Sequence, residues 1–351
     1  MVGLKQFVNF RVQDYQLMQK YYGDKSFFKK VLYCWKKYTY QKKYNFAHME
    51  FFCYHLAEKT KAEVEQFYPR KQQAELYYRV NSKKAWAITK DKFASYLQFG
   101  RYYKRKVCAF NPQPDPLVAD CYQGYDWNSD LILFVESYLQ FIIKPLSDAC
   151  GHGVKIFKRE TFGDEESLLG EFKRDYRKGF VLEELINQHA ALAKYHPSSV
   201  NTIRVNTFNS SSYSIAEGGS IEVKFPVLRV GRMGSVVDNS GSGGIFIAID
   251  EKTGKLQTAA DEEFNSYNEH PDTHVSFDNE IPFWNELLGI AKDVAKLLPE
   301  LRIAGLDFAL DKDKGWVLVE VNCEPHMLYE IATEKGIRQY MEEFERKLRK
   351  S

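Results

Sequence analysis

The chain has 351 residues, of which 44% are hydrophobic and 27% are charged, and its formal net charge is +2. This composition is ordinary for a globular protein with a sizeable core. The six cysteines form no CxxC pair and do not cluster with histidine at zinc-binding spacing, and the most apolar window, 131–143, is too short to span a bilayer. The N-terminus lacks the apolar region of a signal peptide, so we expect a cytoplasmic protein with reduced thiols.

Charge is distributed unevenly along the chain. Residues 1–110 contain 23 Lys+Arg and 8 Asp+Glu, whereas the remainder contains 26 and 39. A basic face attracts anions within a Debye length, roughly 8 Å in physiological salt. The basic third either contacts an anionic partner, such as a membrane surface or a phosphorylated substrate, or packs against the acidic remainder. Nucleic acid is a partner that we do not expect.

The first part of the chain is predicted to be helical. Residues 1–85 contain few helix breakers, and apolar or aromatic residues recur at three and four positions in 27–35, a pattern typical of amphipathic helices. A further helix is predicted to begin at Asp91 and to end at Gly100. Three prolines indicate a loop within 110–129.

The pattern then changes to short apolar segments separated by turn residues. Strands are predicted at 141–145, 154–157, 180–186, 199–208, 221–232, 243–250, 303–311 and 316–322. Helices are predicted at roughly 282–298 and 333–349. Mixed helices and antiparallel pairs indicate the α+β class. We divide the chain into a basic helical region (1–85), a small lobe with a phosphate-binding hairpin (86–184) and a large lobe with a metal site (185–351).

Three oxygen-bearing side chains lie within the last two apolar strands. Glu320 and Asn322 are two positions apart, so they point to the same face of their strand, and a short turn brings Asp307 opposite them. Mg²⁺ prefers this oxygen chemistry. Surface polar residues on an edge strand would be the alternative, but placement inside apolar runs argues against it, because buried carboxylates without a cation are costly.

Cationic residues and glycine loops suggest where phosphates bind. Lys144 lies in an apolar strand, directly before the loop LSDACGHG (146–153), whose backbone N–H groups can cover an anion. Three arginines in strand-like segments carry the planar fork that suits phosphate or carboxylate, although single strand arginines often lie on a solvated face. They are Arg204, Arg229 and Arg232, and the last two precede the glycine loop DNSGSGG.

The order of these segments is FIIKP, a glycine-bearing loop, EELI, NTIRV, LRVGR with DNSGSGG, GLDFAL and VEVN. Over roughly residues 86–340 this order resembles the ATP-grasp superfamily, and most of all the sugar-transfer-associated ATP-grasp domains found near polysaccharide genes. The D-x₁₂-E-x-N spacing from Asp307 to Asn322 is similar to the magnesium triad of D-alanine–D-alanine ligases. The resemblance implies two α+β lobes that clasp ATP, with Mg²⁺ as the metal.

The resemblance also implies individual nucleotide-binding residues. They are Lys92 and Lys144 for the phosphates, Gly151 and Gly153 in the loop that closes over them, Glu183, Glu184 and Ile186 for the adenine hinge, and Gln188 or His189 for the ribose. Peptide ligases of this fold often carry an arginine two residues before the first metal aspartate, where this chain has Gly305. Arg229 or Arg232 must then take any transition-state role, and the D-alanine substrate cannot be inherited.

The leading hypothesis is a carboxylate–amine ligase that works through an acyl phosphate, on an anionic small-molecule or sugar-linked acceptor in surface polysaccharide assembly. That substrate class rests on the resemblance. An ATP-grasp kinase that phosphorylates a hydroxyl is the first alternative. The second alternative, from the basic first third, is a protein that binds an anionic membrane or nucleic acid.

Overall fold

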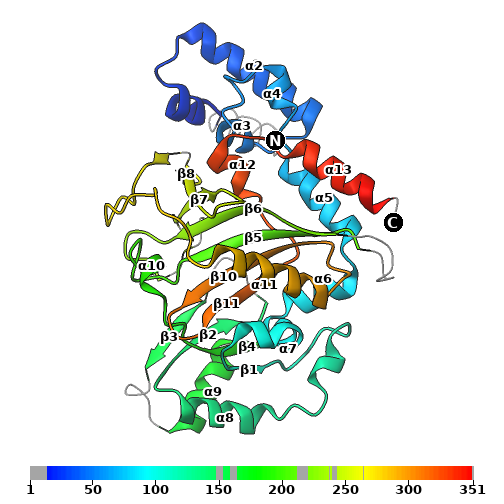
Figure 1. Cartoon of the computed structure of the whole chain (residues 1–351), viewed down its shortest axis with the longest axis vertical. Coiled ribbons are helices and arrows are strands. Elements are labelled where there is room, and N and C mark those ends of the chain that lie inside the picture. Colours follow the sequence, from blue (N-terminus) through cyan, green and yellow to red (C-terminus); the bar gives the residue numbers. More distant parts are fainter. Residues whose placement is uncertain are drawn as a thin grey trace, which may run out of the picture.

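The computed structural model describes residues 14–147, 153–158, 164–211, 220–236, 238, 243–263 and 265–349. Its helices are α2 (Phe27–Tyr44), α3 (Glu50–Cys53), α4 (Lys61–Val64), α5 (Arg70–Val80), α6 (Lys83–Lys90), α7 (Lys92–Tyr103), the 3₁₀ turn η1 (Ala119–Tyr122), α8 (Trp127–Ser137), α9 (Glu165–Asp175), α10 (Ala190–Ala193), α11 (Trp284–Leu297), α12 (Leu328–Thr333) and α13 (Arg338–Leu348). Its strands are β1 (Val107–Phe110), β2 (Gln140–Pro145), β3 (Lys155–Lys158), β4 (Phe180–Glu184), β5 (Thr202–Asn209), β6 (Ile221–Val230), β7 (Ile245–Ile249), β8 (Leu256–Ala260), β9 (Ser266–Tyr267), β10 (Ile303–Asp311) and β11 (Gly315–Asn322). Helices mixed with antiparallel sheets confirm the α+β class (Figure 1).

Helices α2 to α6 confirm the helical prediction for the described part of the N-terminal region. Their aromatic core packs against one face of the larger sheet, where Phe51 and Phe52 share a cluster with Phe246. Within α2 the buried residues are Tyr33 and Lys37. No helix among the described residues has both the length and the apolar character needed to cross a bilayer.

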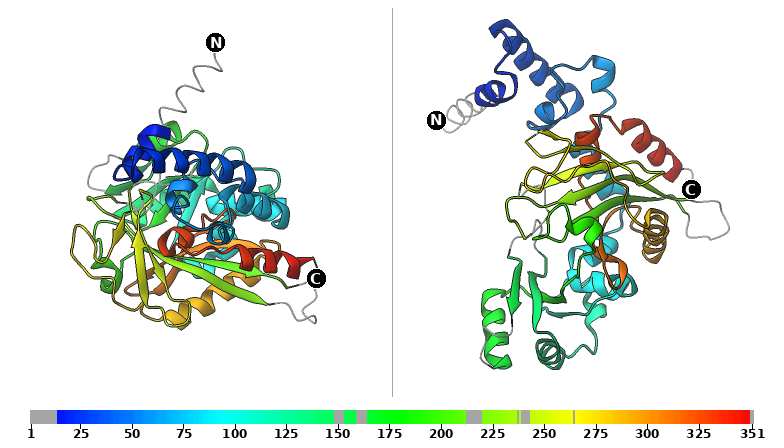
Figure 2. Two further views of the ribbon diagram at one scale, coloured as in Figure 1. Left: turned by 90° about the horizontal axis from the view of Figure 1, so that it is seen from above. Right: turned by 60° about the vertical axis from the view of Figure 1, so that its left-hand side comes forward.

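The smaller sheet has the strand order β1-β4-β2-β3, with every pair antiparallel. The predicted hairpin is confirmed, since β2 pairs with β3 and Phe141 lies opposite Phe157. Helices α8 and α9 cover one face, and Phe134 and Phe172 pack there against the strands. This sheet lies at the end of the molecule far from α2 (Figures 1 and 2).

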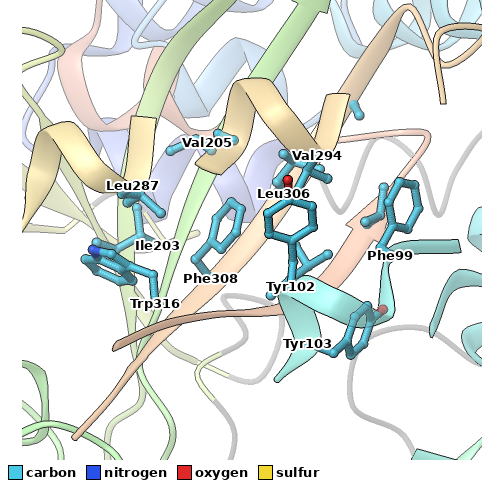
Figure 3. Close-up of a cluster of buried hydrophobic side chains, with 14 of the residues drawn as sticks. Phe99, Tyr102, Tyr103, Ile203, Val205, Leu287, Val294, Leu306, Phe308 and Trp316 are labelled. Atoms are coloured by element: carbon cyan, nitrogen blue, oxygen red, sulfur yellow. The ribbon is translucent and has the colours of Figure 1, made fainter. Parts of the chain in front are cut away.

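The larger sheet has the order β11-β10-β5-β6-β7-β8-β9 and confirms the predicted pairing of the last two strands. Strand side chains alternate between its faces. Ile203, Leu306 and Phe308 point to the core shared with α7 and α11, which Figure 3 shows in close-up. The neighbouring residues Arg204 and Asp307 point to the opposite face, and they begin the candidate site.

Helix α7 begins as predicted but ends later. The Asp91 carboxylate accepts hydrogen bonds from the backbone N–H groups of Phe93 and Ala94, at 3.0 and 2.9 Å. The predicted end at Gly100 is wrong, because the helix continues to Tyr103 and closes at Lys104, whose φ is +48°. A glycine inside a helix costs only about 1 kcal/mol relative to alanine, and the buried last turn of α7 outweighs that cost.

Candidate active site

The predicted metal ligands lie side by side on β10 and β11. Asp307 is paired with Glu320 in the strand register, and the Asn322 Nδ2 atom lies 3.4 Å from the Asp307 Oδ2 atom. Asp307 is buried, whereas Glu320 and Asn322 are half-buried. The structure therefore brings together two carboxylates and one amide on the same face of the sheet.

A β-bulge places two of these ligands on that face. Phe308 pairs with Leu318, but the preceding residue Asp307 pairs with Glu320, so Val319 is an extra residue in β11. Leu318 belongs to the hydrophobic core. Strict alternation from Leu318 would turn Glu320 into the same core, and the extra residue turns it to the opposite face instead.

Two arginines converge on the carboxylate of Asp307. Arg204, which is opposite Asp307 in the register, donates through Nε to Oδ1 and through Nη2 to Oδ2 at 2.7 Å. Arg229 on β6 donates to the same Oδ2 at 2.9 Å. Burial alone would raise the pKa of Asp307, but the charges of Arg204 and Arg229 outweigh burial and lower it below its ordinary value. Asp307 is thus a buried anion at neutral pH.

Asp238 extends this network and was not anticipated from the sequence. Its Oδ1 atom accepts from Arg229 at 3.1 Å, and its Oδ2 atom accepts from the backbone N–H of Thr202 at 3.0 Å. In the sequence Asp238 begins the stretch DNSGSGG. The glycines of this stretch indicated a loop that can approach a ligand, but nothing in it marked the aspartate as a partner of Arg229. Arg229 therefore bridges Asp238 and Asp307.

The third predicted arginine lies in another ion pair. Arg232 Nη1 is 3.2 Å from an oxygen of Asp261 and donates to the Tyr267 hydroxyl at 2.8 Å. Arg204 and Arg229 share Asp307. Among the described residues, Arg232 bonds to Asp261 and Tyr267 and not to Asp307 or Asp238.

The close packing around Gly305 explains why this chain has no arginine two residues before Asp307. A Cβ atom at Gly305 would lie 2.6 Å from Pro325 Cβ and 3.0 Å from Arg204 Cδ. Real Cβ atoms do not approach this closely, so a larger residue does not fit. The space beside Asp307 is filled by the side chain of Arg204, which supplies a guanidinium from the neighbouring strand.

The predicted phosphate lysine is held by a buried carboxylate. Lys144 Nζ donates to Glu183 Oε2 at 2.9 Å, and Arg105 Nη2 donates to the same atom at 2.9 Å. Arg105 also donates to the backbone carbonyls of Leu318 and Val319 on β11. It thereby connects the smaller sheet to the strand that carries Glu320. The sequence shows Arg105 only as one member of the basic run KRK, which gives no sign of this role.

Glu183 is ionised over the whole physiological range. Burial would raise its pKa, but Lys144 and Arg105 outweigh burial and lower it to about 2, from an ordinary value of 4.5. Because the folded-state pKa is depressed, the resulting stabilisation is present above about pH 4.5 and is lost as the pH falls through about 2. Acid should therefore weaken the ion pairs of Glu183, and with them the link that Arg105 makes between the smaller sheet and β11.

We expect Glu183→Gln to lower the free energy of unfolding by about 3–5 kcal/mol, because it leaves Arg105 and Lys144 without their buried carboxylate. Denaturant titration measures this loss. Glu184→Gln is the matched control, since Glu184 pairs with Lys314 at 2.7 Å in a partly exposed position and should cost about 0–1 kcal/mol. Equal losses in the two variants would contradict the role assigned to Glu183.

The predicted adenine hinge follows β4 and lies along the tip of the β10–β11 hairpin. The Asn187 backbone N–H donates to Asp311 at 2.9 Å, and Glu184 pairs with Lys314. Ile186 is half-buried beside them. The side-chain amide of Gln188 bonds the backbone of Ser199 and Asn201, so a ribose contact would compete with these bonds. The nucleotide roles of these residues stay predictions.

The remaining phosphate residues flank the β2–β3 hairpin. The Lys92 backbone N–H donates to the Leu146 carbonyl at 3.2 Å, which places the start of α7 beside the end of β2. Gly153 has φ +73°, and a Cβ atom there would lie 2.8 Å from Pro145, so the turn requires glycine. Gly151 lies outside the described residues. The phosphate contacts of these residues stay predictions.

Comparison with known proteins identifies the family. A model of the sugar-transfer-associated ATP-grasp family matches residues 71–346, and no curated protein sequence matches the chain. Solved structures with a similar fold include the ATP-grasp ligase PsnB complexed with minimal precursor (14% identity, TM-score 0.43, 76% of this chain and 64% of that chain). Others are the D-alanine–D-alanine ligase from Coxiella burnetii (12%, 0.43, 77% and 60%) and D-alanyl-alanine synthetase A from Vibrio cholerae (12%, 0.44, 76% and 68%).

The chain spans less than two thirds of the length of the first two of these proteins. The family model, by contrast, covers most of the chain and includes both sheets described above. The match begins in α5 and ends in α13, so it contains every described residue of the site. The chain therefore belongs to the sugar-transfer-associated ATP-grasp family.

Proposed function

We propose that this protein is an ATP- and Mg²⁺-dependent carboxylate–amine ligase. The observation that carries the proposal is the convergence of Arg204 and Arg229 on Asp307, directly beside Glu320. Carboxylates at this position can bind a metal ion, and guanidinium groups beside them can stabilise the negative charge of a phosphoryl group that moves between two anions. The family description names an association with sugar transfer, which supports a sugar-linked acceptor. An amino-acid acceptor and a place in surface polysaccharide assembly are further parts of the proposal.

The donor set fits Mg²⁺. Asp307 and Glu320 provide two carboxylates on one face, with the side-chain amide of Asn322 beside them, and Mg²⁺ favours one or two carboxylates with substrate phosphates as its other ligands. Bound Mg²⁺ would neutralise charge on the phosphates of ATP.

Charge balance favours a polyanionic ligand at this position. Asp307, Glu320 and Asp238 carry three negative charges when ionised, and Arg204 and Arg229 carry two positive charges. Adding Mg²⁺ leaves a net positive site, which ATP and an anionic acceptor can balance. Lys144, held by Glu183 on the smaller sheet, is the residue that we expect to bind the α- and β-phosphates.

The proposed reaction has two steps. An oxygen of the acceptor carboxylate attacks the γ-phosphorus, and ADP leaves with the electrons of the broken P–O bond. The amine nitrogen then attacks the carbonyl carbon of the acyl phosphate, and phosphate leaves with that oxygen while the nitrogen loses a proton. We expect Arg229 and Arg204 to stabilise the negative charge that develops on the acyl oxygen.

We expect the purified protein to form a hydroxamate when it is given ATP, Mg²⁺, hydroxylamine and a pool of sugar acids and amino acids. Hydroxylamine stands in for the unknown amine and intercepts acyl phosphates. The carboxylate that supports the reaction is then labelled with ¹⁸O, and mass spectrometry of the released phosphate should show one ¹⁸O atom. Heat-inactivated protein provides the background.

The same experiment distinguishes a ligase from a kinase. A kinase leaves the phosphoryl group on the product hydroxyl, so no hydroxamate and no labelled phosphate appear while ADP forms. That result would replace our proposal by the kinase. An anionic acceptor suits two arginines better than a neutral hydroxyl does, and for this reason we favour the ligase.

A further inference from the structure

Helix α2 presents an apolar face to solvent. Six of its side chains are between 47% and 84% exposed, and they are Phe27, Phe28, Val31, Leu32, Trp35 and Tyr38. At about 100° of rotation per residue they fall within an arc of about 140° on one side of the helix. The opposite side is buried through Tyr33 and Lys37, which fixes the orientation of the helix on the protein. We call the six side chains the α2 face.

Positive charge surrounds this face. The 18 residues of α2 include six lysines and no acidic residue. Lys42 and Lys43 occupy the last turn and are exposed, and Lys42 Nζ lies 4.6 Å from the centre of the Tyr38 ring. Lys29, also exposed, lies near the other end. An exposed apolar arc with aromatic residues and bordering lysines is typical of helices that lie in a membrane interface.

We propose that the α2 face docks this protein on a bilayer surface that contains anionic lipid. The apolar and aromatic side chains enter the boundary between headgroups and acyl chains, where Trp and Tyr are favoured. The lysines contact the anionic headgroups, each adding to the attraction within a Debye length.

Charge and apolar pattern favour a lipid surface over other occupants. A second copy of the chain would bring the exposed lysines of two α2 helices together, and like charges repel. A groove that binds single-stranded nucleic acid has cations along the path of the sugar–phosphate backbone. Aromatic side chains lie beside that path, and the bases stack on them. In α2 the aliphatic residues Val31 and Leu32 lie inside the arc instead, and exposed lysines lie toward the ends of the helix.

The position of α2 leaves the part of the candidate site on the smaller sheet uncovered. Helix α2 lies at one end of the molecule, and the smaller sheet with β2 and β4 lies at the other (Figures 1 and 2). Docking through α2 would therefore not cover Lys144 or Glu183. The proposal does not depend on the ligase activity, because it rests on α2 alone.

The full chain should co-sediment with vesicles in which about one third of the lipid is anionic, and far less with neutral phosphatidylcholine vesicles. Raising the ionic strength from about 0.1 M to about 1 M shortens the Debye length from about 10 Å to about 3 Å and should weaken binding at least about tenfold. Brominated lipids should quench tryptophan fluorescence, and the quenched component should be missing in Trp35→Phe.

Two double variants test the α2 face directly. Phe28→Ser with Trp35→Ser, and Lys42→Glu with Lys43→Glu, should each weaken vesicle binding at least about tenfold. Leu133→Ser with Leu139→Ser is the matched control, because these leucines are also exposed but lie at the other end of the molecule, and binding should stay within about twofold.

Thermal unfolding is measured for each variant before binding is compared. We expect every variant to be folded, because all the replaced side chains are exposed. Absence of wild-type sedimentation at low salt would overturn the proposal. So would binding to anionic vesicles that the α2 variants retain, or an α2-dependent dimer that forms without lipid.

Discussion

Replacing Glu320 by glutamine is expected to lower the rate of ADP formation by about 10³-fold, because a metal ion contributes several kcal/mol of charge stabilisation in the transition state. Glutamine keeps the shape of the side chain and removes the charge that would bind Mg²⁺. Glu320 is half-buried, so the fold should tolerate the change. The coupled assay for ADP, run across a magnesium titration, measures the effect, and the variant should need more Mg²⁺ for its residual rate.

Glu324→Gln is the matched control for this experiment. Glu324 lies four residues further along, is exposed and pairs with Lys90 at 2.8 Å. Exposed pairs contribute about 0–1 kcal/mol, so turnover in this variant should equal that of the wild type. If Glu320→Gln also turns over at the wild-type rate, Glu320 does not bind the catalytic metal.

Replacing Arg229 by alanine is expected to cost about 10²–10³ in the rate constant kcat, the usual loss when a donor to a developing oxyanion is removed. The guanidinium lies between Asp307 and Asp238, so this variant should also lose stability. Arg229→Lys keeps the charge and loses the forked geometry, and its rate should fall between those of the wild type and Arg229→Ala.

Arg232→Ala separates stability from catalysis. Arg232 is also a half-buried ion-paired arginine, bound to Asp261 and Tyr267, so its loss should destabilise the fold to a similar degree. Its kcat should fall less than tenfold, because no bond joins it to Asp307. Losses of kcat below tenfold in both Arg229→Ala and Arg232→Ala, measured well below both unfolding temperatures, would show that neither arginine acts on the transferring group.

The last two strands, and the positions of Asp307, Glu320 and Asn322 within them, were predictable from the sequence alone. Apolar runs identified β10 and β11, and the turn between them forced the strands to pair because it is short. Glu320 and Asn322, two positions apart, had to share a face. These features depend on neighbours in the chain, so local pattern predicted the strand pairing and the shared face of Glu320 and Asn322, but not the bulge that turns both toward Asp307.

The contacts around those ligands were decided by tertiary structure. The bulge at Val319 is set by how β10 and β11 pack, and no residue in WVLVEVN marks it. Which arginine reaches Asp307 depends on the register of β5 and β6, formed by segments about a hundred residues from β10. Arg105 joins Glu183, 78 residues away in the sequence, to Val319 on β11, 214 residues away. Such pairings depend on the whole fold and leave no local signal.

Helix α2 also has one feature that the sequence predicted and one that only the tertiary structure decided. Its periodicity predicted an amphipathic helix, and the helix is there. The usual expectation that the more apolar side is buried is wrong here, because Phe27, Leu32 and Trp35 are exposed and Lys37 is buried. A helical period shows that a helix has two different sides. Which side faces the protein depends on the partners available in the folded chain, and here Lys37 forms an ion pair with Asp14 at 2.8 Å on the buried side.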